Sequence, residues 1–319
     1  MSTIMKAAAA RSPHIMPVPT TRSELLKKRV DQFSRVLHAI EEGDVRALHQ
    51  ARVTTRQMRE LLPMLQLDRS SARKLGRRLR KVTRRLGTVR ELDVLLLLID
   101  ELHVSGRRGS GALGRVGVRV SKSRDQARKG LMARLPVTDL GRLARKLDRI
   151  ADSLKDAERA TSKAAARKWR WAVDARVARR ATRLSAAMAD AGALYLPERL
   201  HSVRISVKKL RYAVELSMEA AGHRTSADLR LLKRTQDVLG RLHDQQMLIE
   251  QVRQTQTSLA PPNVTVWRDL DTVIGSLEDD CRRLHARYMG TRAELQAVAE
   301  RRGTERHAHH GRAQARQAG

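Results

Sequence analysis

Apolar residues recur along the chain every three to four positions, as they do in α-helices that bury one face. Strict alternation of apolar and polar residues, which is typical of strands, is nearly absent, and most Pro and Gly residues lie between the periodic stretches. This pattern predicts an all-α protein. We expect a first set of helices near residues 22–42, 44–66, 69–88, 90–104, 112–134 and 138–160. A second set is expected near residues 164–192, 198–221, 225–241, 243–258 and 264–290.

Three places depart from the periodic pattern. Residues 1–20 and 293–319 lie outside it, and we predict flexible tails there, the second of them basic. Pro63 falls inside a periodic stretch. Because proline has no N–H and its ring clashes with the preceding turn, we expect a kink or a helix end at that point.

One histidine and three basic residues occur twice at the same spacing, 152 residues apart: His49, Arg52, Arg56 and Arg59, then His201, Arg204, Lys208 and Arg211. A second pattern follows each set, shifted by 153 residues: Leu86-Gly87-x2-Arg90-Glu91 and Leu239-Gly240-x2-His243-Asp244. This self-similarity predicts two copies of one helical unit, residues 21–160 and 161–292, packed with pseudo-two-fold symmetry.

The spacing of each set has a physical meaning. At about 100° per residue, the four basic positions of one set lie within roughly 80° of one another. Met58 and Leu62 fall on the opposite side of the first helix, as Leu210 and Val214 do on the second. Each helix is therefore expected to bury one face and to present a basic face.

The segment after the first set carries two neighbouring basic stripes with almost no acidic residue near them: Arg73, Arg77, Arg80 and Arg84, beside Lys74, Arg78, Lys81 and Arg85. Like charges one turn apart destabilise a helix, and a merely solvated face would mix charges of both signs. We therefore interpret these stripes as ligand-binding.

The overall charge points in the same direction. The chain has 65 Lys and Arg residues against 34 Asp and Glu residues, a net charge of +31. Such an excess repels itself in a compact protein unless a partner neutralises it. The expected partner is a polyanion, namely a nucleic acid, an anionic membrane or a phosphate polymer.

Cellular location can also be inferred. The single cysteine, Cys281, excludes an internal disulfide and suits a reducing compartment. No apolar run approaches the ~18 residues that a membrane span needs, and the N-terminus lacks the apolar core of a secretory signal. We therefore expect a cytoplasmic protein without a membrane span.

The aromatic content bears on which polyanion is bound. The chain holds one Phe, three Tyr and three Trp, and Tyr212 alone of these falls on a basic face. Proteins that bind single strands usually stack bases on aromatic side chains, so base stacking is disfavoured. Contacts to duplex phosphates remain possible. The residues by themselves thus leave a phosphate polymer and nucleic acid equally open.

These motifs resemble the CHAD family, the conserved histidine α-helical domain, over roughly residues 22–290. The first half holds His49-Gln50-Ala51-Arg52 and Leu86-Gly87-Thr88-Val89-Arg90-Glu91-Leu92-Asp93-Val94. The second half holds His201-x2-Arg204, Lys208-Lys209-Leu210-Arg211-Tyr212 with Glu215, and Gln236-Asp237-Val238-Leu239-Gly240-x2-His243-Asp244. The chain departs from the family at Glu91, where the family usually has Asp.

The resemblance implies two four-helix bundles related by internal pseudo-two-fold symmetry, with a basic groove between them that binds inorganic polyphosphate. It also implies association with polyphosphate granules. Family members often follow a triphosphate-tunnel domain with a Glu-x-Glu-x-Lys signature, and no such motif occurs here. We therefore expect a stand-alone, non-catalytic member that needs no cofactor.

The residues expected to bind polyphosphate are His49, Arg52, Arg56, Arg59, Arg73, Arg77, Arg80, Lys81, Arg84, Arg90, His201, Arg204, Lys208, Lys209, Arg211, Lys233 and His243. We expect four further residues to hold these binding residues in place without contacting the ligand themselves: Tyr212, Glu215, Asp93 and Asp244. Tyr212 and Glu215 share the face of Arg211, so they either orient it or form a routine helix pair. Glu91, Asp93 and Asp244 are better explained as helix N-terminal residues after a Leu-Gly break, although they could also position arginines or a phosphate-bound metal.

Two alternative functions stay open. The chain could bind nucleic acid without sequence preference, or it could process polyphosphate with the help of a metal. His49, His201 and His243 could be imagined as a metal triad, but they sit among basic residues that repel a cation, so we expect no metal site. The sequence shows no nucleophile paired with a general base. The glycines from Gly109 to Gly114 satisfy a dinucleotide motif, but no strand pattern accompanies them, so we interpret them as a loop.

Overall fold

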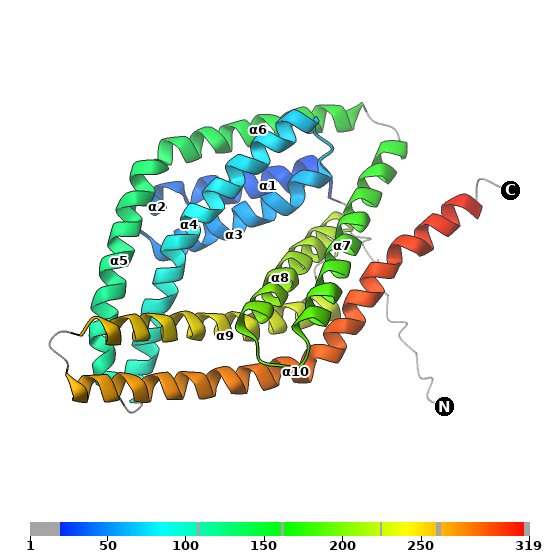
Figure 1. Ribbon diagram of the computed structural model, residues 1–319. Coiled ribbons are helices and arrows are strands. Elements are labelled where there is room, and N and C mark those ends of the chain that lie inside the picture. The colour runs from blue at the N-terminus through cyan, green and yellow to red at the C-terminus, as the bar shows by residue number, and fades with distance from the viewer. Residues whose placement is uncertain (1–19, 107–108, 161–162, 224, 260–262, 316–319) are drawn as a thin grey trace, which may run out of the picture.

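The computed structural model describes residues 20–106, 109–160, 163–223, 225–259 and 263–315, and within these ranges the chain forms only helices and their connections. The first half contains α1 (Arg22–Arg35), α2 (Leu37–Glu42), α3 (Val45–Leu61), the 3-10 turn η1 (Leu62–Met64), α4 (Arg69–Val104), η2 (Ser110–Ala112), α5 (Leu113–Arg134) and α6 (Val137–Arg159). The second half contains α7 (Lys163–Ala191), α8 (Pro197–Ala220), α9 (Ala227–Thr257) and α10 (Val264–Ala315) (Figure 1). The predicted all-α class is confirmed.

Polar side chains fix where several helices begin. Thr21 and Glu24 form a reciprocal capping box at α1, and the carboxylate of Asp44 accepts from two backbone N–H groups at the start of α3. Asp68 caps α4 in the same way, and the hydrogen bond from the backbone N–H of Ser71 lowers the pKa of Asp68 to about 2. These caps satisfy N–H groups that a helix leaves unpaired in its first turn.

Two predicted helix breaks are wrong. The expected breaks near residues 89 and 242 do not exist, because α4 and α9 run unbroken through Gly87 and Gly240. A single glycine inside a helix costs only about 1 kcal/mol relative to alanine, and apolar residues on both sides of each glycine are buried in the core. By contrast, Pro63 does end a helix, since α3 stops at Leu61 and one turn of 3-10 helix follows.

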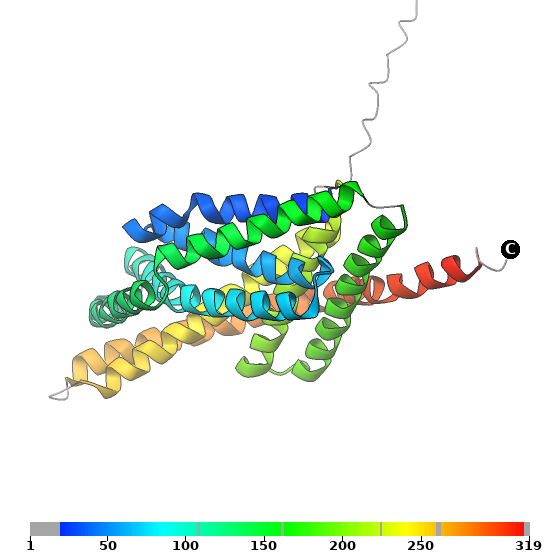
Figure 2. The same cartoon turned by 90° about the horizontal axis from the view of Figure 1, so that it is seen from above.

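The two predicted tails have different outcomes. The expected flexible tail at 293–319 is wrong for most of its length, because α10 continues to Ala315 and extends past the other helices (Figure 2). Leu295, Val298 and Ala299 on this part of α10 are buried, so the apolar stripe that holds the helix in place reaches beyond residue 293. The predicted N-terminal tail, residues 1–20, lies outside the described residues except for its last one.

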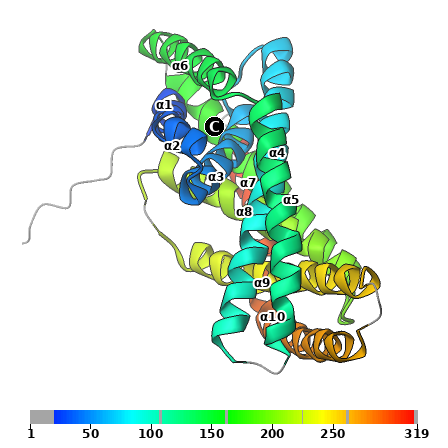
Figure 3. The same ribbon diagram turned by 90° about the vertical axis from the view of Figure 1, so that its left-hand side faces the viewer.

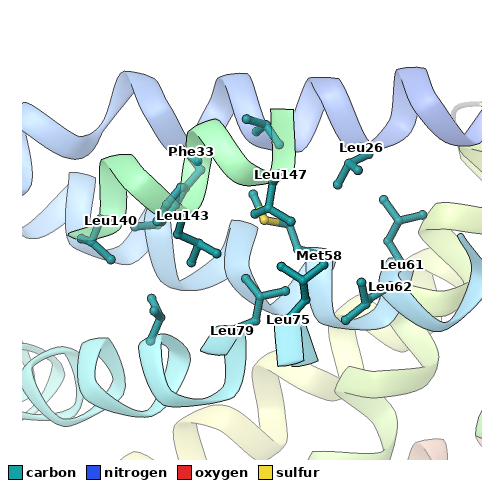
Figure 4. Packing of buried hydrophobic residues seen from close by; sticks show 14 of the residues in the cluster. Leu26, Phe33, Met58, Leu61, Leu62, Leu75, Leu79, Leu140, Leu143 and Leu147 are labelled. Carbon is teal, nitrogen blue, oxygen red and sulfur yellow. The ribbon is translucent and has the colours of Figure 1, made fainter. Parts of the chain in front are cut away.

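The buried apolar side chains gather in three clusters. One lies mainly among α1, α3, the first half of α4, and α6 (Figure 4), and a second among α7, α8, the first half of α9 and the second half of α10. These two clusters correspond to the two expected four-helix bundles. The third joins the second halves of α4 and α9 to the first halves of α5 and α10 (Figure 3), and it was not expected.

The third cluster explains how the two halves of the chain are held together. In the first half, α5 packs on α4 while a different helix, α6, packs on α1; in the second half, the single helix α10 packs on both α9 and α7. The long helices α4, α9 and α10 thus each serve two clusters. The predicted pseudo-two-fold relation between the halves stays a prediction.

A buried ion-pair cluster also links the two halves. Glu60 on α3 accepts hydrogen bonds from Arg176 and Arg180 on α7, with N–O distances of 2.8 and 2.7 Å, respectively. The Glu60 side chain is only 9% exposed and that of Arg180 is 8% exposed. Removing one partner of a buried pair leaves charges without compensation, which is far more costly than losing an exposed pair.

We predict that Glu60→Ala lowers the free energy of unfolding by about 3–5 kcal/mol, because it leaves two arginines buried and unpaired. Asp156→Ala serves as the matched control, since Asp156 lies 4.0 Å from Arg159 and both side chains are more than 70% exposed. The control should cost less than about 1 kcal/mol. Urea denaturation measures both values, and equal losses in the two variants would contradict the role given to Glu60.

Candidate polyanion-binding site

Four helices converge on one cavity. Helix α3 packs on α4 and α8, and α9 packs on both α4 and α8. Where these helices meet they line an open cavity of about 410 Å³. Its walls are formed by His49, Arg52, Val53, Arg56, Arg90, Glu91, Val94, Arg204, Lys208, Arg211, Tyr212, Gln236, Asp237, Gly240, Arg241 and Asp244.

The cavity brings together the cores of both repeated motifs, although they lie 152 residues apart in sequence. Nine of the predicted residues line it: His49, Arg52, Arg56, Arg90, Arg204, Lys208, Arg211, Tyr212 and Asp244. The basic faces of α3 and α8 thus line one shared cavity. An anion that enters it can meet guanidinium groups from both halves of the chain.

Arg52 is held in place by the neighbouring helix. Its Nη2 donates to Glu91 of α4 at 2.9 Å, and its side chain is only 16% exposed. Burial, with Arg56 nearby, lowers the pKa of the Arg52 guanidinium to about 10, so the group remains charged at neutral pH. Glu91 is therefore an acceptor for an arginine of the site.

Lys208 has the most perturbed amine of the cavity. Burial, followed by the positive charges of Arg56, Arg204 and Arg52, lowers the pKa of Lys208 to about 6. No hydrogen bond or ion pair of its amine is found among the described residues. A phosphate placed among these groups would reverse the electrostatic balance and favour the charged amine.

Two of the three motif histidines lie in contact beside the cavity. The Nδ1 atoms of His201 and His243 are 3.3 Å apart, and their rings line a neighbouring cavity of about 820 Å³. Burial and the nearby Arg204 lower the pKa of His243 to about 3, and burial also lowers the pKa values of His201 and His49. In the free protein these imidazoles are neutral at neutral pH.

Arg211 is fixed from three sides. Its Nε donates to the Gln236 side chain at 2.8 Å, and its guanidinium pairs with Glu215 one turn later on α8. The same guanidinium lies 4.4 Å from the centroid of the Tyr212 ring, a cation–π geometry. Burial raises the pKa of Glu215 although Arg211 opposes this. Glu215 and Tyr212 thus orient Arg211 at the cavity wall.

The three acidic residues near the Leu-Gly motifs do not cap helices. Because α4 and α9 are continuous, Glu91, Asp93 and Asp244 lie inside helices, and the N-terminal capping interpretation is wrong. Asp244 faces Arg204 across the cavity. Asp93 is instead buried against α5, where Arg124 donates to it at 3.0 Å, so it supports the packing of α4 on α5 and not the cavity.

Several predicted binding residues lie outside the cavity. His201 and His243 line the neighbouring cavity, and Arg59 and Lys209 are half-buried close to the Glu60 cluster. Exposed positions away from the cavity are occupied by Arg73, Arg77, Arg80, Lys81 and Arg84 on α4 and by Lys233 on α9. Arg59 lies near enough to Arg80 for that charge to help lower the pKa of Arg59, after burial.

The sequence interpretation missed some residues of the wall. Asp237 and Arg241 line the cavity with Gly240 and Asp244, at the spacing i, i+3, i+4 and i+7 of one helix face. Arg241 also forms a two-pronged ion pair with Glu101 of α4, at 2.5 and 2.7 Å. The predicted helix over 225–241 already placed Asp237, Gly240 and Arg241 on one face, but only the tertiary fold shows that this face meets α3 and α8 at the cavity.

In the part of the chain that the structure describes, no helix is both long and apolar enough to cross a membrane. The same part contains no group of three or more His, Cys, Asp or Glu side chains arranged to hold a metal ion.

Comparison with known proteins identifies the family. The model of the CHAD domain matches residues 24–253. PptA from Streptomyces chartreusis is similar in structure, with a TM-score of 0.64, 19% sequence identity, and coverage of 86% of this chain and 99% of the other. The crystal structure of the CHAD domain from the plant Ricinus communis is similar with a TM-score of 0.54, 22% identity, and coverage of 86% and 88%. No curated protein matches the chain. Since the family model spans more than half of the sequence, the chain belongs to the CHAD domain family.

Proposed function

We propose that this protein binds inorganic polyphosphate, without catalysing its breakdown, in the cavity between α3, α4, α8 and α9. The observation that carries the proposal is the convergence of Arg52, Arg56, Arg204, Lys208 and Arg211 on a cavity of about 410 Å³. The guanidinium groups repel one another and are largely desolvated, and burial together with their charges lowers the pKa of Lys208 to about 6. An anion with several charged oxygens relieves that repulsion, and phosphate oxygens match the fork of arginine.

Polyphosphate suits this cavity better than nucleic acid does. It is a thin chain with a charge at every phosphate and no sugar or base to accommodate, so it can follow a narrow path between helices. The aromatic ring at the cavity wall is that of Tyr212, and the Arg211 guanidinium already lies over it, 4.4 Å from the ring centroid. Base stacking of the kind used by single-strand binders has no free platform there. Binding of this kind would attach the protein to polyphosphate granules in the cytoplasm.

Replacing Arg56 tests the cavity with little risk to the fold, because no ion pair with an acidic residue is found for it in the described part of the chain. We expect Arg56→Ala to weaken the binding of a short polyphosphate about tenfold, the worth of one charged hydrogen bond. The slope of log affinity against log salt should fall by roughly one unit. Fluorescence titration at several salt concentrations measures both quantities.

The control removes the same kind of charge elsewhere. Arg145 and Lys146 are exposed on α6, away from the cavity, so Arg145→Ala/Lys146→Ala should change affinity far less than Arg56→Ala does. Equal effects in the two proteins would mean that net charge, and not this cavity, binds the polymer. The variant Arg73→Ala/Arg77→Ala, measured in the same way, decides whether the exposed stripe of α4 contributes.

We also expect affinity to depend on pH. In the free protein the pKa of Lys208 is about 6, and bound phosphate raises it, so binding takes up a proton between the two pKa values. Affinity for long polyphosphate should therefore rise as the pH falls from about 8 to about 6, and level off below. Lys208→Arg, which is charged throughout, should flatten this dependence. His49 and His201 also have lowered pKa values, and a residual slope in Lys208→Arg would be assigned to them. An unchanged slope in that variant would exclude Lys208 as the source.

Competition separates the proposal from its alternatives. Long polyphosphate should displace labelled DNA from the protein at equal phosphate concentration, while DNA should displace polyphosphate poorly. Duplex DNA or RNA that competes equally well would favour the nucleic-acid alternative. Incubation with polyphosphate and Mg²⁺, followed by gel analysis, should leave the chain length unchanged; shortening that is lost in Arg56→Ala would favour a metal-dependent enzyme.

A further inference from the structure

Gly87 lies in the middle of α4, where glycine is unfavourable. The residue is buried, and the helix continues on both sides of it from Arg69 to Val104. Glycine inside a helix is less stable than alanine because it loses more backbone freedom on folding. A glycine kept at such a position calls for a physical reason, such as a neighbour that occupies the space of a side chain.

That neighbour is Arg52 of the cavity. A Cβ atom on Gly87 would lie 3.3 Å from Nε, 3.4 Å from Nη2 and 3.8 Å from Cζ of Arg52. The guanidinium therefore lies across α4 in the space that any other residue would fill with its side chain. The Arg52 Nε is fully buried and has no hydrogen-bond partner, as expected for an atom pressed against a helix backbone.

Glu91 completes this arrangement one turn further along α4. The Arg52 Nη2 that passes Gly87 ends 2.9 Å from the Glu91 carboxylate. A gap and an acid four residues apart on one helix face thus fix both the position and the direction of an arginine carried by another helix. Neither feature alone would do so, since the gap leaves the guanidinium free to rotate and the acid can be reached only across the gap.

The equivalent glycine of the second repeat does not do the same. A Cβ atom on Gly240 would meet no heavy atom within 4 Å, and Gly240 itself lines the cavity. The space occupied by an arginine is therefore found beside Gly87 but not beside Gly240.

We propose that Gly87 is a positioning residue of the polyanion site: it leaves the space on α4 in which the guanidinium of Arg52 lies, so that Glu91 can direct it to the cavity. The inference rests on the proposed function only for the ligand, because the slot itself is a property of the free protein. It explains why a small residue stands at the centre of a long helix beside an arginine of the site.

Binding measurements test the positioning role. Gly87→Ala forces Arg52 to move by a few tenths of an ångström, and Gly87→Leu forces it out of the slot. We expect a small loss of affinity for short polyphosphate in Gly87→Ala and a loss of about tenfold in Gly87→Leu, with the salt slope reduced by roughly one unit. In an Arg52→Ala background, Gly87→Leu should cause no further loss. An equal loss with and without Arg52 would overturn the proposal.

Thermal unfolding in the absence of ligand tests the slot independently. Gly76→Ala on the same helix is the control, since its Cβ would meet Leu62 at an ordinary distance of 3.6 Å, and it should raise Tm by about two degrees. Gly87→Ala should not raise Tm in the wild-type background, but should raise it as the control does once Arg52 is replaced by Ala. A rise in both backgrounds would show that Arg52 does not need the space. If these shifts follow expectation while no variant or wild type binds polyphosphate, the slot stands and the proposed function fails.

Discussion

The structure depends on bringing like charges together in a confined space. Arg52, Arg56, Arg204 and Lys208 approach one another at the meeting of four helices, where water is partly excluded and Coulomb repulsion is stronger than in bulk solvent. The lowered pKa of Lys208, to about 6, and of Arg52, to about 10, express that repulsion together with burial. A cavity of this kind is costly in the free protein and favourable when an anion occupies it, which is the thermodynamic basis of the proposed binding.

The rest of the fold offsets this cost. Three apolar clusters pack the helices that meet at the cavity against their neighbours. The long helices α4, α9 and α10 each take part in two of these clusters. Buried acids then hold individual arginines: Glu60 pairs with Arg176 and Arg180, and Glu215 with Arg211. The basic residues of the cavity wall outnumber its acidic residues, Glu91, Asp237 and Asp244, so the arginines are oriented while a net positive charge remains for an external anion.

Much of this arrangement could be predicted from the sequence. The helical period gave the all-α class, and the repeated spacing of His49, Arg52 and Arg56 identified residues that line the cavity. The path of α4 and α9 through Gly87 and Gly240 could not be predicted, because a glycine ends a helix or continues it according to packing that lies far away in sequence. That one uncertainty misassigned Glu91, Asp93 and Asp244 as helix-capping residues, whereas the contact between Gly87 and Arg52 depends on the packing of α3 against α4. The stripe from Arg73 to Arg84 shows what a charge pattern cannot predict. The pattern identifies a basic helix face, but only the tertiary fold decides whether that face meets the cavity.

A crystal structure with a short polyphosphate tests the central claim most directly. The account predicts phosphate groups inside the cavity, with oxygens within hydrogen-bond distance of Arg52, Arg56, Arg204 and Lys208, and with the Arg52–Glu91 contact retained. Phosphates bound along the exposed Arg73–Arg84 face of α4, with none between α3 and α8, would contradict it.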